Sequence, residues 1–595
     1  MKIMKRYILF AASSLMMVSC LDTTVLPVDK IIEEDYWQNK SDVSAMVNGA
    51  YQAMTSADVI ERMIVWGELR GDNVNPTENL GTTKAGIDEI NSLNMDDKNT
   101  YASWTAFYNV INKCNLVLDH AAAVMSIDPS YSEGNYLTDR SQMLALRALS
   151  YFYLVRTFRD VPYSGTAYQN SSQPMELRQA SPDSVLTLCI RDLEEAETVA
   201  LSSKGFKDWR RCGLLTRDGI RAILADVYLW RGSMNKSAAD YQKCVDLCNQ
   251  IIESKIQIAE ENQVGRGQIS QVLDDFPLYK YQYAFMQNFI NGNSAESVFE
   301  LQLNGSYAVN TAVRNLYYMY RENQTPGFIS ASKMMGSNVG AVPENVFMSA
   351  NDVRFWESTY AVKNNEADAF AIRKMVGQTQ NNFNASSPKA YAVETRSETF
   401  ARFAQNWIVY RLTDIMLMKA EALTQLASDD ATMDSDPMLN EAFDMVQKVY
   451  TRSLAAEADS LNRGSYSDKN AMEQLVLDER QRELCYEGKR WFDLMRYTYR
   501  HMDGVDSRQT MAKQHLSLTN SRGEKEANIE DFPQIYGSMI TLLSRKYLEN
   551  AGVLVYQLTT EPKLYMPISY SEIKVNDNLK QTPGYKSGSD YEKNY

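Results

Sequence analysis

The sequence predicts a mostly α-helical protein in which helices come in antiparallel pairs around a loop-rich insertion. Apolar residues recur every three or four positions over several long segments, which is the period of an amphipathic helix. Small residues such as Ala148, Ala225 and Ala422 lie where paired helices would pack closely. The region 261–407 lacks this period and is rich in Asn, Gln, Ser, Gly and Tyr, which indicates irregular structure with a few strands.

The first 19 residues predict an export signal. A basic start precedes the apolar run 7–18, which is too short to span a bilayer. Ser19 then precedes Cys20, an arrangement that resembles a bacterial lipobox. We therefore expect cleavage before Cys20 and a lipid anchor on that cysteine. The alternative is an ordinary secretory signal in which the cysteine has no role.

The charge balance argues against nucleic acid as a partner. The 595-residue chain has a formal net charge of −14, whereas phosphate contacts need clustered Lys and Arg. Removal of the basic signal makes the mature chain more acidic still, so it should touch an anionic membrane only through its lipid. No later run is apolar enough to cross a membrane.

Helical periodicity predicts three helix pairs before the insertion and one after it. Ser181 and Pro182 favour a helix start, as an N-cap followed by proline at the first helical position. A strand is expected at 297–303, where apolar and polar residues alternate. The predicted helices are 41–57, 101–124, 139–158, 181–200, 216–231, 237–253, 408–428 and 438–455.

The four pairs resemble a divergent tetratricopeptide array, and a general helical bundle is the alternative. We expect an N-terminal helical part over 20–260 and a C-terminal part over 261–595, together forming one compact unit. Within the second part, the insertion spans 261–407 and regular helices span 408–500.

The stretch 479–497, with the sequence ERQRELCYEGKRWFDLMRY, alternates charges with large apolar residues. Gly488 is expected to end one helix and let another begin, since glycine adopts left-handed backbone without steric cost. Opposite charges three residues apart face each other on a helix. These pairs are Arg480 with Glu483, Glu487 with Arg490, Arg490 with Asp493, and Asp493 with Arg496.

Two hypotheses compete for this stretch, a catalytic carboxylate pair and a structural clamp. A glycosidase needs two carboxylates about 5–10 Å apart, and Glu479, Glu483, Glu487 and Asp493 are the candidates. An arginine partner lowers a carboxyl pKa and makes a poor general acid. We therefore predict a charged clamp that docks the last helices. It consists of Arg480, Glu483, Glu487, Arg490, Asp493 and Arg496.

Other catalytic and metal motifs are missing from the sequence. The histidines His120, His501 and His515 lie far apart, and no phosphate loop or nucleophile elbow is present. Asp434 and Asp436 fall far short of a calcium coordination set. We predict no catalytic residue, no metal site and no cofactor.

Ordered stretches over nearly the whole mature chain resemble the SusD/RagB family of outer-membrane lipoproteins. They include MLALRA at 143–148, NSAESVFE at 293–300, YRLTDIML at 410–417 and YMPI at 565–568. The other matches are Cys20 and the segments 151–152, 161–162, 479–497, 572–573 and 578–585. Arg159 departs from the pattern, because the family usually has glycine there.

The resemblance implies a SusD-like fold, with four tetratricopeptide-like helix pairs packed against a loop-rich part that presents ligand. It also implies a binding protein and not an enzyme. Such a protein would be lipid-anchored on the outer membrane of a Gram-negative bacterium, at the cell surface. There it would capture oligosaccharide and deliver it to a SusC-like TonB-dependent transporter. A peptide-binding RagB-like import subunit is one alternative, and a surface glycoside hydrolase is another.

Ligand residues are predicted from chemistry alone, because no family motif identifies them. Aromatic faces stack on sugars, while Asp, Asn and Arg bind their hydroxyl groups. Candidates lie near the start of the chain's long polar loop and in the insertion. They are Asp72, Asn73, Asn75, Tyr317, Tyr320, Arg321 and Trp356. Core packing is the alternative for each, and Trp104 and Trp491 are expected to be core.

Overall fold

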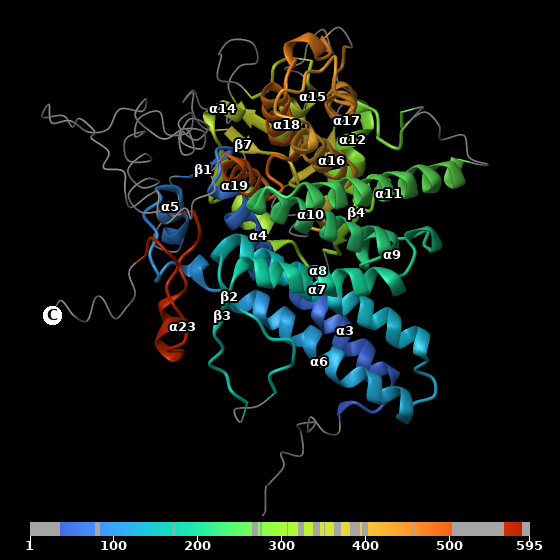
Figure 1. Ribbon diagram of the computed structural model, residues 1–595, viewed down its shortest axis with the longest axis vertical. Coiled ribbons are helices and arrows are strands. Elements are labelled where there is room, and N and C mark those ends of the chain that lie inside the picture. The colour runs from blue at the N-terminus through green and yellow to red at the C-terminus, as the bar shows by residue number, and fades with distance from the viewer. Residues whose placement is uncertain are drawn as a thin grey trace, which may run out of the picture.

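The structure is a computed structural model, and it describes most of the chain between residues 36 and 585 (Figure 1). The described ranges are 36–77, 84–169, 173–263, 272–273, 276–305, 308–318, 327–336, 346–349, 351–361, 370–380, 393–395, 403–456, 459–501 and 564–585.

The predicted helix pairs before the insertion are confirmed. The long helices stack in the order in which they occur in the chain, and each packs on the next (Figure 1). Ser181 caps its helix as expected, accepting a hydrogen bond from Ser184 N, with Pro182 in the first turn. The helices are α3 (Lys40–Met54), α6 (Thr105–Ile127), α7 (Glu133–Phe158), α8 (Pro182–Val199), α10 (Arg217–Asn235) and α11 (Ala238–Gln263).

The fourth pair differs from the prediction at its start. The helices are α16 (Leu412–Leu426) and α17 (Pro437–Arg452), with α16 packed on α11. Residues 408–411, predicted as the start of a helix, instead belong to strand β10 (Trp407–Arg411), which pairs antiparallel with β4 (Ser297–Leu301). The sequence WIVYR is β-branched and aromatic, which suits a strand, and both strands are buried along their whole length.

The remaining strands are short and lie mainly in the insertion. One sheet has the order β1-β5-β7-β6, and all its pairs are antiparallel. Its strands are β1 (Val74–Pro76), β5 (Ile329–Ala331), β6 (Thr359–Ala361) and β7 (Phe370–Ile372). Two further pairs are β2 (Val161–Pro162) with β3 (Gln179–Ala180) and β8 (Gly377–Gln380) with β9 (Val393–Thr395).

Shorter helices connect these elements and carry the stretch 479–497. That stretch spans α18 (Lys469–Leu484) and α19 (Arg490–Arg500). The others are α4 (Ala57–Ile64), η1 (Val65–Leu69), α5 (Ala85–Asn91), η4 (Thr100–Ala102), η5 (Ser203–Gly205), α9 (Arg210–Gly213), α12 (Tyr281–Phe285), η6 (Met286–Asn291), α13 (Thr311–Tyr317), α14 (Lys333–Gly336), α15 (Val353–Ser358), η9 (Arg463–Ser465) and α23 (Tyr570–Val575).

One hydrophobic core runs through the helix stack and into the C-terminal part. Trp104 and Trp491 belong to it, as predicted, with 4% and 0% of their surfaces exposed. The segment 564–585 returns to the N-terminal helices, where Met566 N donates to Thr157 O at 2.8 Å. The last described segment therefore packs against α7, in the same helix stack that contains the N-terminal helix α3 (Figure 1).

Arg159 ends α7 with φ +72° and ψ −82°. Asp160 N donates to Phe158 O at 3.1 Å, so the three residues form a γ-turn with positive φ at its centre. That backbone is strained for any residue with a side chain. Arginine in place of the family's usual glycine therefore strains the backbone at this turn.

Candidate functional site

The turn between α18 and α19 brings the charged stretch against the start of the chain. Gly488 has φ +72°, as expected for a residue that ends one helix before the next begins. It approaches η1 so closely that a Cβ on Gly67 would lie 1.9 Å from Gly488 O. Glycine is therefore required at position 67, and the contact fixes α19 against η1.

Glu483 is the centre of the first charge cluster. It accepts from Arg411 at 2.6 Å, from Arg354 at 2.8 Å and from Arg452. Burial alone would raise the pKa of Glu483, but the three guanidinium groups together hold that pKa well below its ordinary value. Glu487 is held in the same way by Arg411, with contacts of 2.8 and 2.9 Å. Both carboxylates are therefore kept ionised and paired.

A second cluster lies between α16 and α19. Arg496 makes two bonds to Glu421, at 2.7 and 2.8 Å, and a third to Asp493 at 2.7 Å. Arg480 bridges Asp493 and Asp414, each at 2.9 Å. The pKa of Asp414 falls to about 2, because Lys489 and Arg480 outweigh the effect of burial, which would raise it. Charged side chains at this depth are tolerated only when paired in this way.

Three of the four expected pairs at a spacing of three residues are wrong. Of the four, only the Asp493–Arg496 pair forms among these described residues. The others are replaced by partners from distant segments, such as Arg411 for Glu483 and Asp72 for Arg490. All six residues of the predicted clamp are buried and paired. That geometry is consistent with the structural role, which stays a prediction.

Asp72 and Asn73 are enclosed by this network, which argues against the ligand role predicted for them. Arg490 makes a bidentate pair with Asp72, at 2.7 and 2.9 Å, and Asp72 is 1% exposed. Asn73 donates to Glu68 at 2.7 Å and accepts from Gln481 at 2.9 Å. Neither side chain presents a face to solvent, so both act here as links between η1 and the α18–α19 unit.

The other predicted ligand residues fall into three groups. Tyr317 is fully buried and donates to Tyr486 O at 3.1 Å, which argues against its predicted role as a stacking platform. Asn75, on edge strand β1, and Trp356, on α15, are half-buried and keep part of their surface open. Tyr320, Arg321 and Cys20, the predicted site of lipid attachment, lie outside the described residues.

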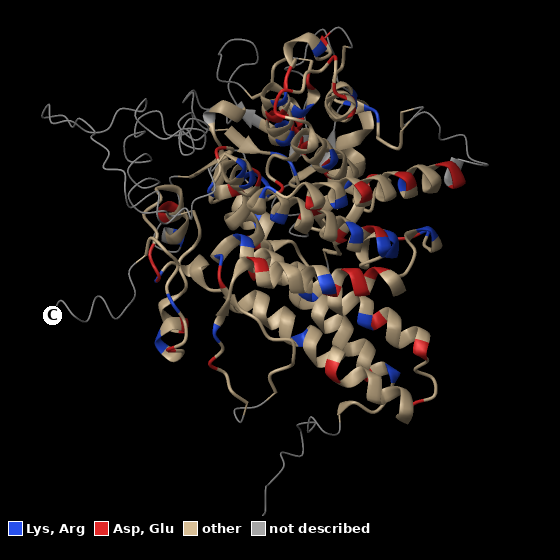
Figure 2. Ribbon diagram, in the orientation of Figure 1, with Lys and Arg blue, Asp and Glu red and all other residues tan. Residues whose placement is uncertain are grey.

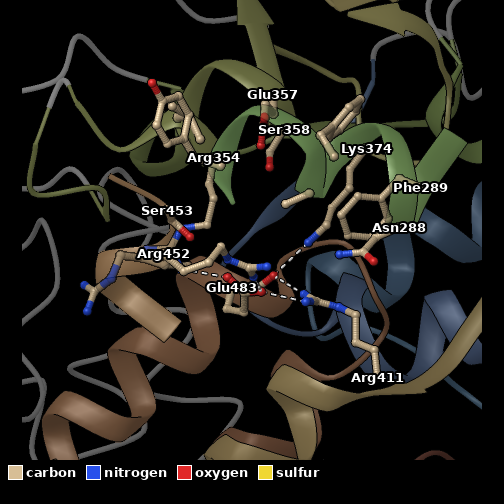
Figure 3. A pocket seen from close by; sticks show the side chains of 15 residues that line it. Asn288, Phe289, Arg354, Glu357, Ser358, Lys374, Arg411, Arg452, Ser453 and Glu483 are labelled. Carbon is tan, nitrogen blue, oxygen red and sulfur yellow. Dashed lines mark hydrogen bonds and ion pairs between the residues drawn. The ribbon is translucent and has the colours of Figure 1, made fainter. Parts of the chain in front are cut away.

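The hollow beside Glu483 is too small for a sugar. Figure 3 shows basic side chains from separate segments converging on this carboxylate, among them Arg354, Arg411 and Arg452. The space between them is about 20 Å³, enough for about one water molecule. Its cations are already bound to Glu483 and its neighbours. The hollow therefore belongs to the structural network.

An open cleft lies where α10 and α11 meet the loop that follows α8. It has a volume of about 340 Å³, within the range of small-molecule sites. Its lining is hydrophilic throughout, consisting of Ser202, Ser203, Lys204, Arg217, Asp218, Arg221, Gln250, Glu253, Ser254 and Gln257. Asp218 accepts from both Ser203 and Ser254. No pattern in the sequence points to these residues, because they come from three segments with no shared motif.

The described residues offer no cluster of three or more His, Cys, Asp or Glu side chains that could hold a metal ion. The buried carboxylates of α18 and α19 all have cationic partners, and the pKa of Glu483 is moved away from neutrality. Such groups suit structure better than acid–base chemistry.

The stacked helix pairs and the loop-rich insertion define a mostly helical protein of paired, stacked helices. Sequence comparison identifies it further. Residues 286–585 match the family model described as "SusD family", and residues 27–229 match one described as "Starch-binding associating with outer membrane". The chain belongs to the SusD family.

Curated relatives and solved structures agree. The chain is 26% identical to SusD-like protein P38 of Formosa agariphila over 492 residues, covering 79% of this chain and 86% of the relative. It is 23% identical to SusD-like protein P2 of the same organism, over 83% of this chain and 91% of the relative.

A SusD superfamily structure from Bacteroides thetaiotaomicron has a TM-score of 0.62 at 19% identity, and covers 92% of this chain and 99% of that one. B. fragilis NanU gives a TM-score of 0.59 at 17% identity, with 94% and 100% coverage. These likenesses establish the mostly helical SusD fold. Proteins of this family bind glycans for nutrient uptake and are carbohydrate-binding rather than catalytic.

The family is one that associates with the outer membrane. Among the helices that the structure describes, none has the length and apolar character to cross a bilayer.

Proposed function

We propose that this protein is a cell-surface lipoprotein that captures oligosaccharides and passes them to a SusC-like TonB-dependent transporter. The observation that carries the proposal is membership of the SusD family, to which the match over residues 286–585 assigns the chain. The hydrophilic cleft of about 340 Å³ supports it, since hydroxyl, amide and charged groups suit a ligand rich in hydroxyl groups.

The proposed ligand surface differs from the one that the sequence predicts. Asn75 and Trp356 stay in it as half-buried residues, and Tyr320 and Arg321 stay in it from the insertion. Asp72, Asn73 and Tyr317 leave it, because their side chains are buried among protein atoms. The paired carboxylates of α18 and α19 have no part in binding.

Oligosaccharide binding is tested with the mature chain carrying Cys20→Ser, so that it stays free of lipid. Calorimetric titration with maltoheptaose, mannohexaose and xylohexaose, together with a glycan array, should find at least one binder. A heat-denatured sample is the control for nonspecific adhesion. Failure of every glycan would contradict the proposal. Binding of a peptide library with no glycan binding would point to a peptide-import subunit instead.

The anchor and the transporter are tested on the full-length protein in its native cells. Cys20 should direct the protein to the outer-membrane fraction, and Cys20→Ser should release it. Affinity purification of the wild-type protein in mild detergent should recover a TonB-dependent transporter. Equal membrane association of both forms would remove the anchor from the proposal, and purification without any transporter would remove the partner.

A further inference from the structure

Trp209 stands out on the surface of the described chain. It is 48% exposed, and it is the one aromatic residue among the large hydrophobic side chains that the described part leaves exposed. The residue directly precedes α9, the short helix at the edge of the stack beside α10 and β4 (Figure 1). A single exposed aliphatic residue needs no explanation. An indole face left open to water between the charged residues Asp208 and Arg210 does.

The local backbone holds Trp209 in place. Trp209 O accepts from Gly213 N at 2.7 Å and from Cys212 N at 3.2 Å, which closes the turn of α9. Within the described residues the indole N–H meets no acceptor, so it remains free to donate to a bound hydroxyl. The ring is therefore exposed on a fixed backbone rather than on a free chain.

The backbone of Gly213 lies next to both the Trp209 indole and the Gln302 side chain. A Cβ at Gly213 would lie 2.7 Å from Cε3 of Trp209 and 2.6 Å from Cγ of Gln302. Both side chains therefore pack over the backbone of Gly213, in space that the side chain of any other residue would occupy. Gly213 is therefore needed for the contact between the aromatic and the amide.

Gln302 is itself fixed by a network of amides. It exchanges two hydrogen bonds with Asn293, at 2.9 and 3.1 Å, and accepts from Asn406 at 3.3 Å. Asn406 also donates to Glu300 at 2.8 Å. This pairing locks the planar groups in one orientation. Such preorganisation lowers the entropy cost of binding a ligand beside them.

Asp208 and Arg210, the neighbours of Trp209 in the sequence, form a planar ion pair. Arg210 binds Asp208 through Nε at 3.0 Å and through Nη2 at 2.7 Å, and its guanidinium also lies 5.1 Å from the Phe206 ring centroid. Figure 2 shows basic residues at this edge of the molecule. The pair offers donors and acceptors in one plane, which matches neighbouring hydroxyl groups on a sugar ring.

We infer that Trp209 is the stacking platform of a saccharide-binding site, with Gln302, Asp208 and Arg210 beside it. The apolar face of a pyranose covers the indole, and Asp208 and Arg210 bind its hydroxyls. The Gln302 amide, which already makes four hydrogen bonds within the protein, holds the surface beside the ring in place. No more than about 17 Å of extended chain separates Trp209 from Lys204 in the polar cleft. An oligosaccharide that lies on the indole can therefore continue toward the cleft.

This inference rests on the proposed glycan-binding function, and the experiment separates the two. The mature chain with Cys20→Ser is titrated with maltoheptaose, mannohexaose and xylohexaose, with and without Trp209→Ala. The variant should bind about tenfold more weakly, since losing a stacking contact of about 1.4 kcal/mol has that effect. Trp209→Phe should stay within about threefold, because it keeps an aromatic face. Ile127→Ala, which truncates another exposed side chain, should bind as wild type.

Tryptophan emission provides a readout that a structural role would not change. Sugar should shift the emission of the wild type, and Trp209→Phe should lose the part of that shift that comes from Trp209, while both proteins unfold at the same urea concentration. Equal affinity of Trp209→Ala and wild type, or an emission shift of undiminished size in Trp209→Phe, would overturn the site and leave the function standing. A wild type that binds none of the three sugars counts against both.

Discussion

Replacement of Arg490 by alanine tests whether the buried network is structural. Arg490 and Asp72 are 2% and 1% exposed, and two bonds of 2.7 and 2.9 Å join them. Arg490→Ala removes the cation and leaves the Asp72 carboxylate buried without its partner. Breaking a buried pair in this way costs about 3–5 kcal/mol. We therefore expect the free energy of unfolding to fall by about that amount.

Two further variants separate this cause from the loss of an arginine as such. Arg463→Ala removes an arginine whose side chain is 43% exposed and whose partner Asp444 is 57% exposed, so it should cost about 0–1 kcal/mol. The double variant Asp72→Leu with Arg490→Met should recover most of the loss, because apolar residues of similar volume often replace a buried ion pair without penalty.

The assay is equilibrium urea unfolding of the mature chain, followed by circular dichroism, with glycan affinity measured in parallel. Arg490→Ala should lower the urea midpoint and bind sugar normally wherever it remains folded. A variant that unfolds at the wild-type midpoint but no longer binds would refute the structural assignment and place this stretch in the ligand site.

Three further perturbations follow from single positions. Gly67→Ala would place a methyl group against the Gly488 carbonyl, and we expect a loss of about 3 kcal/mol or more in urea unfolding. Gly49→Ala, in a helix with no atom within 4 Å, should instead gain up to about 1 kcal/mol. Arg159→Gly relieves the positive-φ turn and should raise stability by about 1 kcal/mol. The pKa of Asp414 is about 2 when folded and near 3.8 when unfolded. Its contribution of about 2 kcal/mol is therefore present above pH 4 and disappears as the pH falls from 4 to 2.

Each of these has a result that would contradict it. Equal midpoints for Gly67→Ala and Gly49→Ala would mean that the close approach of the two backbones is not needed. A less stable Arg159→Gly would show that the Arg159–Asp160 ion pair outweighs the backbone strain. For the acid range, Asp414→Asn should lose about 2 kcal/mol less than wild type between pH 4 and pH 2. Identical losses would exclude Asp414 as a source of the acid sensitivity.

The helices could be predicted because their signal is local. Periodicity and caps located all four pairs, and Ser181 with Pro182 fixed one boundary to the residue. Strand β10 was missed because its apolar run continues directly into the helical pattern of α16. The β-branched and aromatic composition of WIVYR was the signal that could have separated the two.

The site could be predicted only in part, because ion-pair partners are not local. Interleaved charges and aromatics correctly indicated buried ions, but the helical spacing gave the wrong partners. Arg490 meets Asp72, 418 residues away, and no local pattern carries that information. The same pairing argues against the ligand role that the sequence predicts for Asp72. Trp209 was overlooked because a tryptophan in KDWRR has no periodicity, although its charged neighbours pointed to an exposed loop.

The most direct test of glycan capture is calorimetric titration of the mature, lipid-free chain with maltoheptaose, mannohexaose and xylohexaose. We predict saturable binding of at least one of them, with the same affinity in Arg463→Ala, which alters a surface ion pair away from the proposed site. Absence of binding to all three, repeated on a full glycan array with protein that unfolds cooperatively in urea, would contradict the proposal.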